Sequence, residues 1–234
     1  MYSFDSRIRY SETDSEGRLT LMALLNYFQD CSTFQSEDAG VGVQYCRERN
    51  LVWVLNAWQI VPIRLPKYGE RVRIGTAPYD FQKFMGFRNF MMFDEEGSYL
   101  AKANSVWSLI DITTERFVIP DEAMIKGYPK EERIPMDYAG RKINLPKEGE
   151  LREPIPVLPH HLDSNYHVNN GQYVSMALEF LPADVTIKQL RAEYKKQAFL
   201  GDVIHPFVAR EDGRITVALQ DAQGKPFAIV EFEL

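Results

Sequence analysis

The chain has 234 residues, of which 45% are hydrophobic and 26% charged, and its formal net charge is −6. This composition excludes a disordered or collagen-like chain, and the acidic balance argues against nucleic acid as a partner, because phosphate binding needs a concentrated basic surface. Two cysteines without metal-ligand spacing argue against a disulfide framework. The N-terminus lacks a signal-peptide pattern, and no apolar run approaches the roughly 18 residues of a membrane span. We therefore expect a cytoplasmic protein without a membrane partner.

The predicted elements of the first half are an opening strand, one long helix and an antiparallel sheet. After a strand at 4–10, apolar side chains recur at helical spacing and predict a helix from about residue 20 to residue 39. Segments rich in aromatic and β-branched residues then predict four strands, at 52–65, 70–81, 84–93 and 99–112. One helix followed by such strands predicts an α+β fold in which the sheet wraps the helix.

The second half repeats this order after a connection. Residues 118–159 hold seven of the 13 prolines among charged clusters, which is typical of a linker or a long connection. Asp14 precedes the first helix as Asp163 precedes a second, shorter helix at 171–180, and the final hairpins share an Asp-Gly turn pattern. The sequence therefore predicts two copies of a helix followed by four strands. The expected boundaries are an N-terminal domain at 1–117, a linker at 118–153 and a C-terminal domain at 154–234.

The junction before the second helix carries the densest group of polar side chains. Asp163, Asn165 and His167 stand at i, i+2 and i+4, so an extended backbone would project all three to one side. An acid, an amide and an imidazole would then lie together. His160 and His161 add two more imidazoles, but no second cluster of ligands accompanies them, so we predict no metal site and no cofactor.

A helix N-terminus follows this polar group directly. Asn169 or Asn170 is placed to cap the helix. The first N–H groups of the helix, near Asn170 and Gly171, could hold an oxyanion, and Gly171 would let a substrate approach the backbone closely.

Two stretches of the sequence resemble the acyl-acyl carrier protein thioesterases of plants and bacteria. They are Asp163-x-Asn165-x-His167-Val168-Asn169-Asn170-x-x-Tyr173 and Glu193-Tyr194-Lys195-Lys196-Gln197-Ala198. The resemblance implies a tandem of two hotdog domains, each a sheet curled around a central helix. It also implies a thioester hydrolase that releases free fatty acid from fatty acyl-acyl carrier protein in fatty acid biosynthesis. The acyl carrier protein would then be the partner, and a homodimer of tandems is compatible with the fold.

One departure from the family concerns the strand after the second helix, which typically reads Glu-Tyr-Arg-Arg-Glu-Cys. The later Glu is proposed to be catalytic in the family, and it is Gln197 here, followed by Ala198 in place of Cys. A glutamine cannot act as a base, although its amide can orient a water. The expected catalytic residues are Asp163, Asn165 and His167, with Gln197 beside them. Either Asp163 or His167 could be the base, and Asn165 would bind the thioester carbonyl or fix the imidazole.

Two further sets of side chains have a functional and a structural interpretation. Aromatic residues of the first copy could line an acyl pocket, as the resemblance implies, or form the sheet core; the candidates are Trp53, Trp58, Phe84 and Phe87. Basic residues in and near the strand after the second helix could receive an acidic carrier, although a solvated strand face is the preferred interpretation. These are Lys188, Arg191, Lys195 and Lys196.

Two alternatives to the leading function stay open. The carrier could be coenzyme A, which would make the protein an acyl-CoA thioesterase. Because Gln197 replaces the family Glu, the protein could also be a catalytically weak acyl-binding double hotdog. In the first copy Asp14 stands without the Asn and His that follow Asp163, so we expect that copy to be non-catalytic.

Overall fold

The computed structural model describes residues 1–163 and 165–234, which form two compact units. The first unit comprises Met1–Leu55 and Val61–Tyr138, and the second comprises Asn56–Ile60 and Ala139–Leu234. The predicted connection is therefore divided between the units, and the three predicted domain boundaries remain a prediction. None of the helices in the described residues has the length and apolar character that a membrane span requires.

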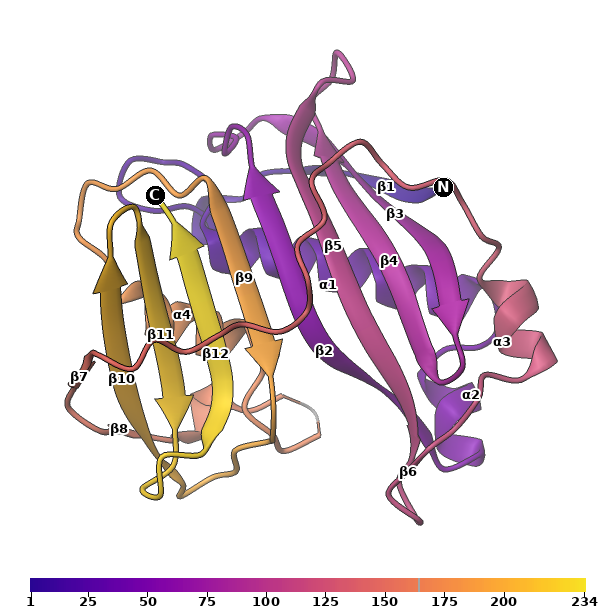
Figure 1. The fold of residues 1–234 in the computed structure, drawn as a ribbon. Coiled ribbons are helices and arrows are strands. Elements are labelled where there is room, and N and C mark those ends of the chain that lie inside the picture. The colour runs from indigo at the N-terminus through magenta and orange to yellow at the C-terminus, as the bar shows by residue number, and fades with distance from the viewer. Residues whose placement is uncertain (164) are drawn as a thin grey trace. The chain divides into compact units, whose positions relative to one another are not determined.

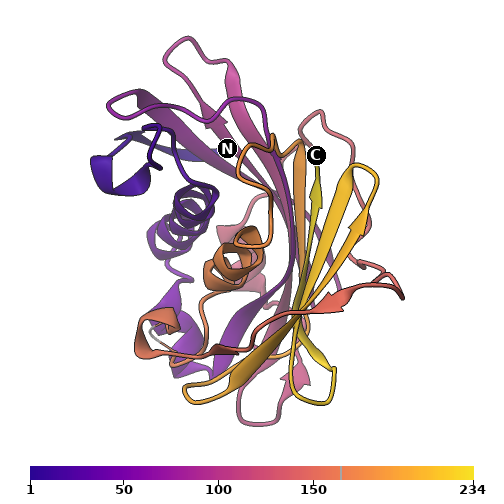
Figure 2. The same cartoon turned by 90° about the vertical axis from the view of Figure 1, so that its left-hand side faces the viewer.

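The first unit is an antiparallel sheet with a long helix on one face (Figures 1 and 2). Its strand order is β1-β3-β4-β5-β2. The strands are β1 (Tyr2–Arg7), β2 (Leu51–Pro62), β3 (Arg71–Gln82), β4 (Met85–Phe93) and β5 (Tyr99–Asp111), and the helix is α1 (Leu21–Asp38). A short turn of 3-10 helix, η1 (Tyr10–Glu12), follows β1. The helix and the four strands after it lie where the sequence predicts them.

Helix α1 begins and packs as its sequence pattern indicates. Thr20 is the N-cap, and its hydroxyl accepts a hydrogen bond from the Ala23 N–H at 3.1 Å. Leu24 and Phe28 are fully buried on the sheet-facing side, and the Phe28 ring lies 5.4 Å from the ring of Phe90 in β4. Burial of this apolar stripe holds the helix on the sheet.

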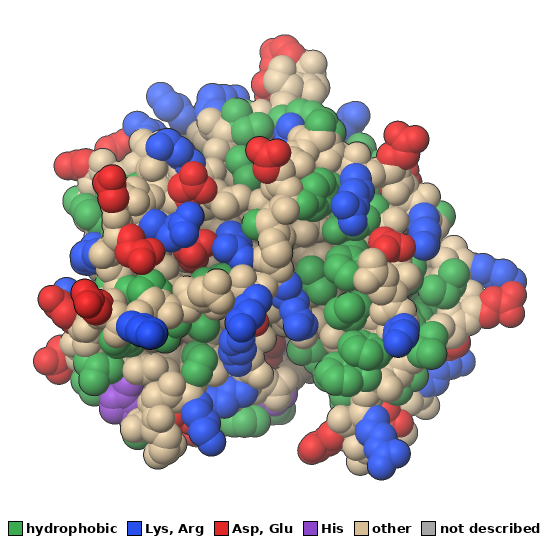
Figure 3. Space-filling model, viewed as in Figure 1, with side chains coloured by type: hydrophobic (Ala, Val, Ile, Leu, Met, Phe, Trp, Pro, Cys, Tyr) green, Lys and Arg blue, Asp and Glu red, His purple; other side chains and the backbone are tan. Residues whose placement is uncertain are grey.

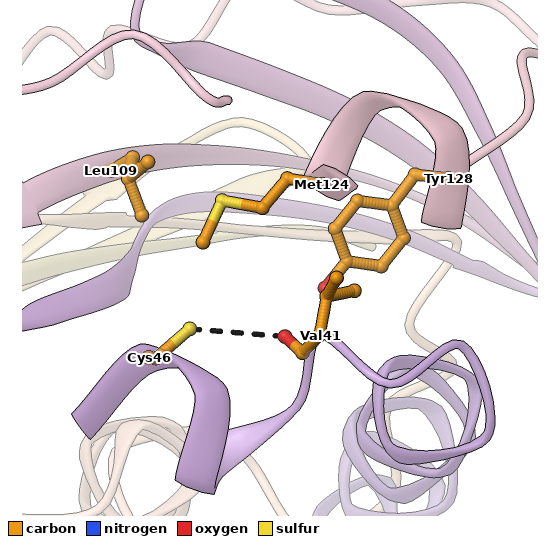
Figure 4. Close-up of a cluster of buried hydrophobic side chains, with 5 residues drawn as sticks. All are labelled: Val41, Cys46, Leu109, Met124 and Tyr128. Atoms are coloured by element: carbon orange, nitrogen blue, oxygen red, sulfur yellow. Dashed lines mark hydrogen bonds between the residues drawn. The ribbon is translucent and has the colours of Figure 1, made fainter. Parts of the chain in front are cut away.

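One end of the first unit is closed by short helices that the sequence pattern did not indicate. They are α2 (Val43–Glu48) and α3 (Glu122–Gly127), and the short strand β6 (Arg116–Phe117) pairs with β5 nearby. Figure 4 shows the cluster that joins them, made of Val41, Cys46, Leu109, Met124 and Tyr128. Helix α3 begins at Asp121, whose carboxylate accepts the Met124 N–H at 2.9 Å. Part of the predicted linker is therefore folded into the core of this unit.

The second unit repeats the helix-on-sheet arrangement. Its strand order is β2-β9-β12-β11-β10-β7, with residues 56–60 of β2 at one edge, and β8 also pairs with β10. The elements are β7 (Glu150–Leu151), β8 (Ile155–Pro156), η2 (Pro159–His161), α4 (Asn170–Leu178), β9 (Gln189–Tyr194), β10 (Val203–Glu211), β11 (Arg214–Gln220) and β12 (Pro226–Glu233). The four strands after α4 match the predicted second copy.

The face of this sheet opposite α4 is crossed by the chain that leads to β7 (Figure 1). The Ile143 N–H donates to the buried carboxylate of Glu193 in β9 at 2.9 Å, and Ile143 packs on Ala218 and Ile229. Arg191 donates to the Gly140 and Lys142 carbonyls. These contacts cover a sheet face that would otherwise be open to water.

One turn recurs in both units. In each copy of this turn an Asp N–H donates to the carbonyl of the residue four positions later, and the Asp carboxylate accepts the N–H of that same residue. The turns start at Asp14, Asp94 and Asp221. The third residue after each Asp is a glycine with positive φ, of 73° at Gly17, 82° at Gly97 and 77° at Gly224. Glycine suits this backbone because it has no Cβ to clash.

We expect Asp14→Ala to lower the free energy of unfolding by about 1 kcal/mol, because the N–H groups of Glu16 and Arg18 lose their shared acceptor. Asp14→Asn keeps an acceptor oxygen and should lose markedly less. Urea denaturation of both variants tests this, and equal losses would contradict it.

Candidate active site

The segment from Asp163 to His167 is a tight turn, so the predicted extended backbone is wrong; Ser164, inside it, lies outside the described residues. Asp163 Oδ1 accepts the N–H groups of Asn165 at 2.8 Å and His167 at 3.4 Å. The Asp163 N–H donates to the His167 carbonyl at 2.8 Å, and Leu162 pairs with Val168. An aspartate that bonds its own backbone closes a turn where simple alternation predicts a strand.

This turn sets two of the three predicted residues opposite each other. Asp163 and His167 are opposed across it, so their side chains leave the backbone on the same side. Asn165 occupies the exposed tip instead. The predicted triad is therefore a pair with Asn165 beyond it, and the catalytic roles of all three stay predictions.

Tyr166 gives this turn an unusual backbone. It has φ of 62°, whereas the matching position in the other three turns is glycine. A side chain in this region costs about 1 kcal/mol relative to glycine. The turn beside His167 therefore carries strain that its three counterparts avoid.

His167 is fixed by the chain that follows β9. Its backbone pairs with Phe199, and the two rings meet edge to face with centroids 4.9 Å apart. Val168 donates its N–H to the Ala198 carbonyl at 3.0 Å. The half-buried imidazole has no hydrogen-bond partner among the described residues. Gln197 lies two residues before Phe199 in the chain, and its side chain is exposed.

The N-terminus of α4 follows the turn directly, and Asn169 is its N-cap as predicted. The Asn169 amide oxygen accepts the Gly171 N–H at 2.8 Å. An oxyanion at Gly171 would therefore compete with the Asn169 amide oxygen for the Gly171 N–H. The Asn170 N–H, first in the helix, has no acceptor within the described part of the chain, so the predicted oxyanion position falls there.

Two tyrosines, the buried Tyr173 and the half-buried Tyr194, tie this helix to β9 and the chain beyond it. The Tyr194 hydroxyl donates to the Asn170 carbonyl at 3.0 Å, and the Tyr173 hydroxyl accepts the Ala198 N–H at 3.0 Å. Burial raises the pKa of Tyr173 to about 12, so it stays protonated at neutral pH. Both residues belong to the motifs quoted above, but only the tertiary structure gives them this positioning role.

Of the two histidines before the turn, His161 accepts a hydrogen bond from the backbone. His161 is 9% exposed, and its Nδ1 accepts the Leu158 N–H at 3.0 Å. Burial, together with the neighbouring His160, lowers the pKa of His161. Among the described residues, no group of three or more His, Cys, Asp or Glu side chains is placed to hold a metal ion.

The structure does not gather the predicted acyl-pocket residues into one cluster. Gly86 faces the α1 side of the first unit's sheet, and Trp53 lies 3.4 Å from where a Cβ on Gly86 would be. Phe87, the next residue, points to the other face and contacts Tyr79.

Phe84 stacks on Phe117 at the turn between β3 and β4, with centroids 4.3 Å apart. Trp58 belongs to the second unit and is 2% exposed. Of the candidates in the first unit, Trp53 alone is placed beside the α1 face, and an acyl-binding role stays a prediction.

The basic residues of the predicted landing site are all engaged. Arg191 pairs with Glu231 at 2.8 Å, Lys195 pairs with Glu193 at 2.6 Å, and Lys196 pairs with Asp221. Lys188 donates to the Leu234 carbonyl at 2.6 Å. Figure 3 shows acidic and basic side chains interspersed over this face of the second unit. The charges are paired within the fold, and Arg191 lies beneath the chain that crosses this sheet face, so at Arg191 the solvated strand face preferred from the sequence is wrong.

The first unit contains the same junction with different side chains. Arg18 pairs with Lys67 as His167 pairs with Phe199, and the Leu19 N–H donates to the Pro66 carbonyl at 2.8 Å. Glu16 and Arg18 stand where the second unit has Asn165 and His167, and they form an ion pair at 2.7 Å. The backbone frame is repeated, but the imidazole is not.

Two family models match the sequence. The model described as acyl-ACP thioesterase N-terminal domain covers residues 1–128, and the one described as acyl-ACP thioesterase C-terminal domain covers residues 146–225, where ACP is acyl carrier protein. The chain belongs to the acyl-ACP thioesterase family.

Relatives within this family share the sequence weakly and the fold closely. A chloroplastic palmitoyl-acyl carrier protein thioesterase of Cuphea hookeriana is 26% identical over 221 residues, covering 87% of this chain and 53% of that protein. The chain spans about half the length of the curated relatives it matches.

Solved structures of acyl-ACP thioesterases confirm the predicted α+β tandem hotdog fold. The acyl-ACP thioesterase of Bacteroides thetaiotaomicron has a TM-score of 0.90 at 22% identity, covering 99% of this chain and 96% of that one. The 12:0-ACP thioesterase of Umbellularia californica has a TM-score of 0.85 at 20% identity, covering 100% and 97%.

In this member of the acyl-ACP thioesterase family, we expect His161 to make stability depend on pH. Its folded pKa lies below the ordinary value of 6.5, so the unfolded chain binds more protons as the pH falls below that value. The contribution of His161 to stability is therefore complete above pH 6.5, and it is lost as the pH falls from 6.5 toward the pKa of His161 in the folded protein.

Melting temperatures measured from about pH 5 to about pH 8 test this linkage. The wild type should melt at lower temperature on the acid side, and His161→Gln should flatten that dependence. His160→Gln, at an exposed neighbour, should keep most of it, because burial is the larger cause of the lowered pKa of His161. An unchanged slope in His161→Gln would refute the assignment.

Proposed function

We propose that this protein is a thioesterase that hydrolyses fatty acyl-ACP to free fatty acid and holo-carrier, with His167 as the general base. The observation that supports this most directly is the His167 imidazole. It has no hydrogen-bond partner among the described residues and stands opposite Asp163 at the entry to α4. Membership of the acyl-ACP thioesterase family supports the substrate class.

The reaction needs a base and an oxyanion donor. His167 takes a proton from water as the water oxygen attacks the thioester carbonyl, and imidazole titrates in a range that suits this task. The resulting oxyanion lies at the first N–H groups of α4, where the helix dipole favours negative charge. The C–S bond then breaks. The leaving thiolate takes up the proton that the imidazolium received from water, and it departs as the thiol.

Asp163 acts through the backbone in this proposal. Its Oδ1 accepts two N–H groups and so fixes the turn that carries His167. Oδ2 has no hydrogen-bond donor among the described residues and can face the imidazolium that forms during reaction. In this proposal Asn165, at the exposed tip, meets the substrate outside the turn, and the exposed Gln197 amide orients the attacking water.

The partner and compartment follow from the same proposal. The carrier is ACP, because the related plant enzymes are an acyl-ACP hydrolase and a palmitoyl-ACP thioesterase. Cys31 and Cys46 are both free and buried, which fits a reducing cytoplasm. No nucleic acid, membrane or cofactor takes part, and a homodimer of the tandem is compatible with the mechanism.

We expect His167→Ala to lower kcat for acyl-ACP hydrolysis by about 10²- to 10⁴-fold, because the base is lost. Arg18→Ala is the matched control, because Arg18 occupies the same backbone position in the first unit. It should keep near wild-type kcat. Similar rates for wild type and His167→Ala would remove His167 from the mechanism.

The carrier is tested with matched acyl-ACP and acyl-coenzyme A substrates, with mass spectrometry of the acids released from a mixed pool. A preference for acyl-ACP supports the proposal, and a preference for acyl-coenzyme A favours the acyl-CoA thioesterase alternative. The same experiment reports which chain lengths are released.

A catalytically weak acyl-binding protein is the second candidate, because Gln197 replaces the family Glu. If the site has been weakened in this way, Gln197→Glu should raise kcat at least tenfold, about 1.4 kcal/mol of barrier. An unchanged or lower kcat together with vigorous wild-type hydrolysis would exclude this candidate. Gln197→Ala controls for loss of the side chain.

A further inference from the structure

The chain places a tyrosine where its own fold uses glycine. Four turns share the same Asp-anchored backbone, and three of them have glycine at the positive-φ position, at 73°, 82° and 77°. The fourth has Tyr166, at 62°. All other features being equal, glycine would form this turn at lower cost, because Tyr166 forces a Cβ into the left-handed region.

The Tyr166 side chain makes no interaction with the described residues that would compensate for this strain. It is 79% exposed, and among the described residues it makes no hydrogen bond, ion pair or ring contact. Strain that the fold does not compensate is characteristic of binding and catalytic positions. The side chain therefore has its use outside the folded chain itself.

Its position shows where that use lies. Tyr166 immediately precedes His167, whose ring packs against Phe199. Phe199 is itself 49% exposed and Leu200 is 58% exposed. Three exposed apolar side chains thus stand next to His167 in the chain or across its backbone pair: Tyr166 before it, Phe199, whose ring contacts the imidazole, and Leu200 after Phe199.

The chemistry of a thioester identifies what meets these side chains. Beyond the sulfur, the substrate continues into the pantetheine arm, a flexible chain of short alkyl and amide groups. A tyrosine offers an apolar ring for the alkyl groups and a hydroxyl for an amide. The arm is common to ACP and coenzyme A, so this recognition does not depend on which carrier bears it.

We infer that Tyr166 is a specificity-determining residue that contacts the pantetheine arm of the thioester while His167 acts on the carbonyl. The inference rests on the proposed function. It adds a residue that selects substrates bearing the arm, and it explains why the turn beside the imidazole is the strained one of the four.

The test compares Tyr166→Gly with wild type on two thioesters of one acyl chain, an acyl-pantetheine and an acyl-ethanethiol that lacks the arm. We expect the variant to melt about 2–4 °C higher, since strain is relieved. Its kcat/KM should fall about 2- to 10-fold on the acyl-pantetheine, through KM, and stay unchanged on the acyl-ethanethiol. Equal kinetics on both substrates, or a lower melting temperature, would overturn the inference.

Two further variants separate the side chain from the backbone. Tyr166→Asn tolerates positive φ without the ring and should show the same loss on the acyl-pantetheine. Gly17→Tyr places the same side chain in the matching turn of the first unit, where the added Cβ meets nothing within 4 Å. It should lower the melting temperature and leave the kinetics unchanged; an equal kinetic loss there would overturn the inference.

Comparison of acyl-ACP with acyl-coenzyme A identifies the contact. An equal loss on both supports the arm, whereas a loss confined to acyl-ACP would assign Tyr166 to the body of the carrier and refute the inference. A non-hydrolysable thioether between the acyl chain and pantetheine gives a readout without catalysis. If Tyr166→Gly weakens its binding 2- to 10-fold, the inference stands even where wild type hydrolyses nothing and the proposed function fails; unchanged binding refutes it.

Discussion

The carboxylate of Asp163 is the constraint on which the junction before α4 depends. By accepting the N–H groups of Asn165 and His167, it bends the chain into a turn and sets His167 opposite itself. Val168 can then donate to Ala198, and Asn169 can cap α4. The imidazole, the helix N-terminus and the chain after β9 are held together because one side chain bonds its own backbone. The carboxylate that sequence reasoning offers as a candidate base is first of all a structural anchor.

The same frame in the first unit shows that backbone and chemistry are separable. Asp14 anchors an equivalent turn, Thr20 caps α1, and Arg18 pairs with Lys67 where His167 pairs with Phe199. The Glu16 carboxylate and the Arg18 guanidinium form an ion pair there, and no imidazole stands at this position. The hotdog fold therefore supplies a turn that leads into a helix N-terminus. The proposed site lies on the copy of this turn that carries an imidazole.

Sequence reasoning predicted the elements whose physical cause is local. The apolar spacing of α1, the strands of the first sheet, the Asp-Gly turns and the Asn169 cap all follow from neighbouring residues. The alternation rule failed at Asp163–His167 because a side-chain-to-backbone bond competes with extended structure.

Features that depend on strand register or tertiary contacts could not be read in this way. Alternation along β2 or β4 separates the two faces of the sheet but does not show which face α1 covers, so the surroundings of Trp53 and Phe87 depend on tertiary packing. The positioning roles of Tyr173 and Tyr194 exist only because β9 and the chain after it lie against α4.

The replacement of the family Glu by Gln197 changes the balance of charge at the site as well as its supply of bases. A carboxylate at this position would repel the oxyanion that forms on the thioester carbonyl, whereas a neutral amide does not. The site then loses a base but also loses a repulsion in the transition state. A thiolate leaves without needing a strong acid, so stabilising the oxyanion is the larger part of the task in thioester hydrolysis. With Asp163 holding the turn and His167 as the proposed base, the amide at 197 is consistent with the proposed hydrolase.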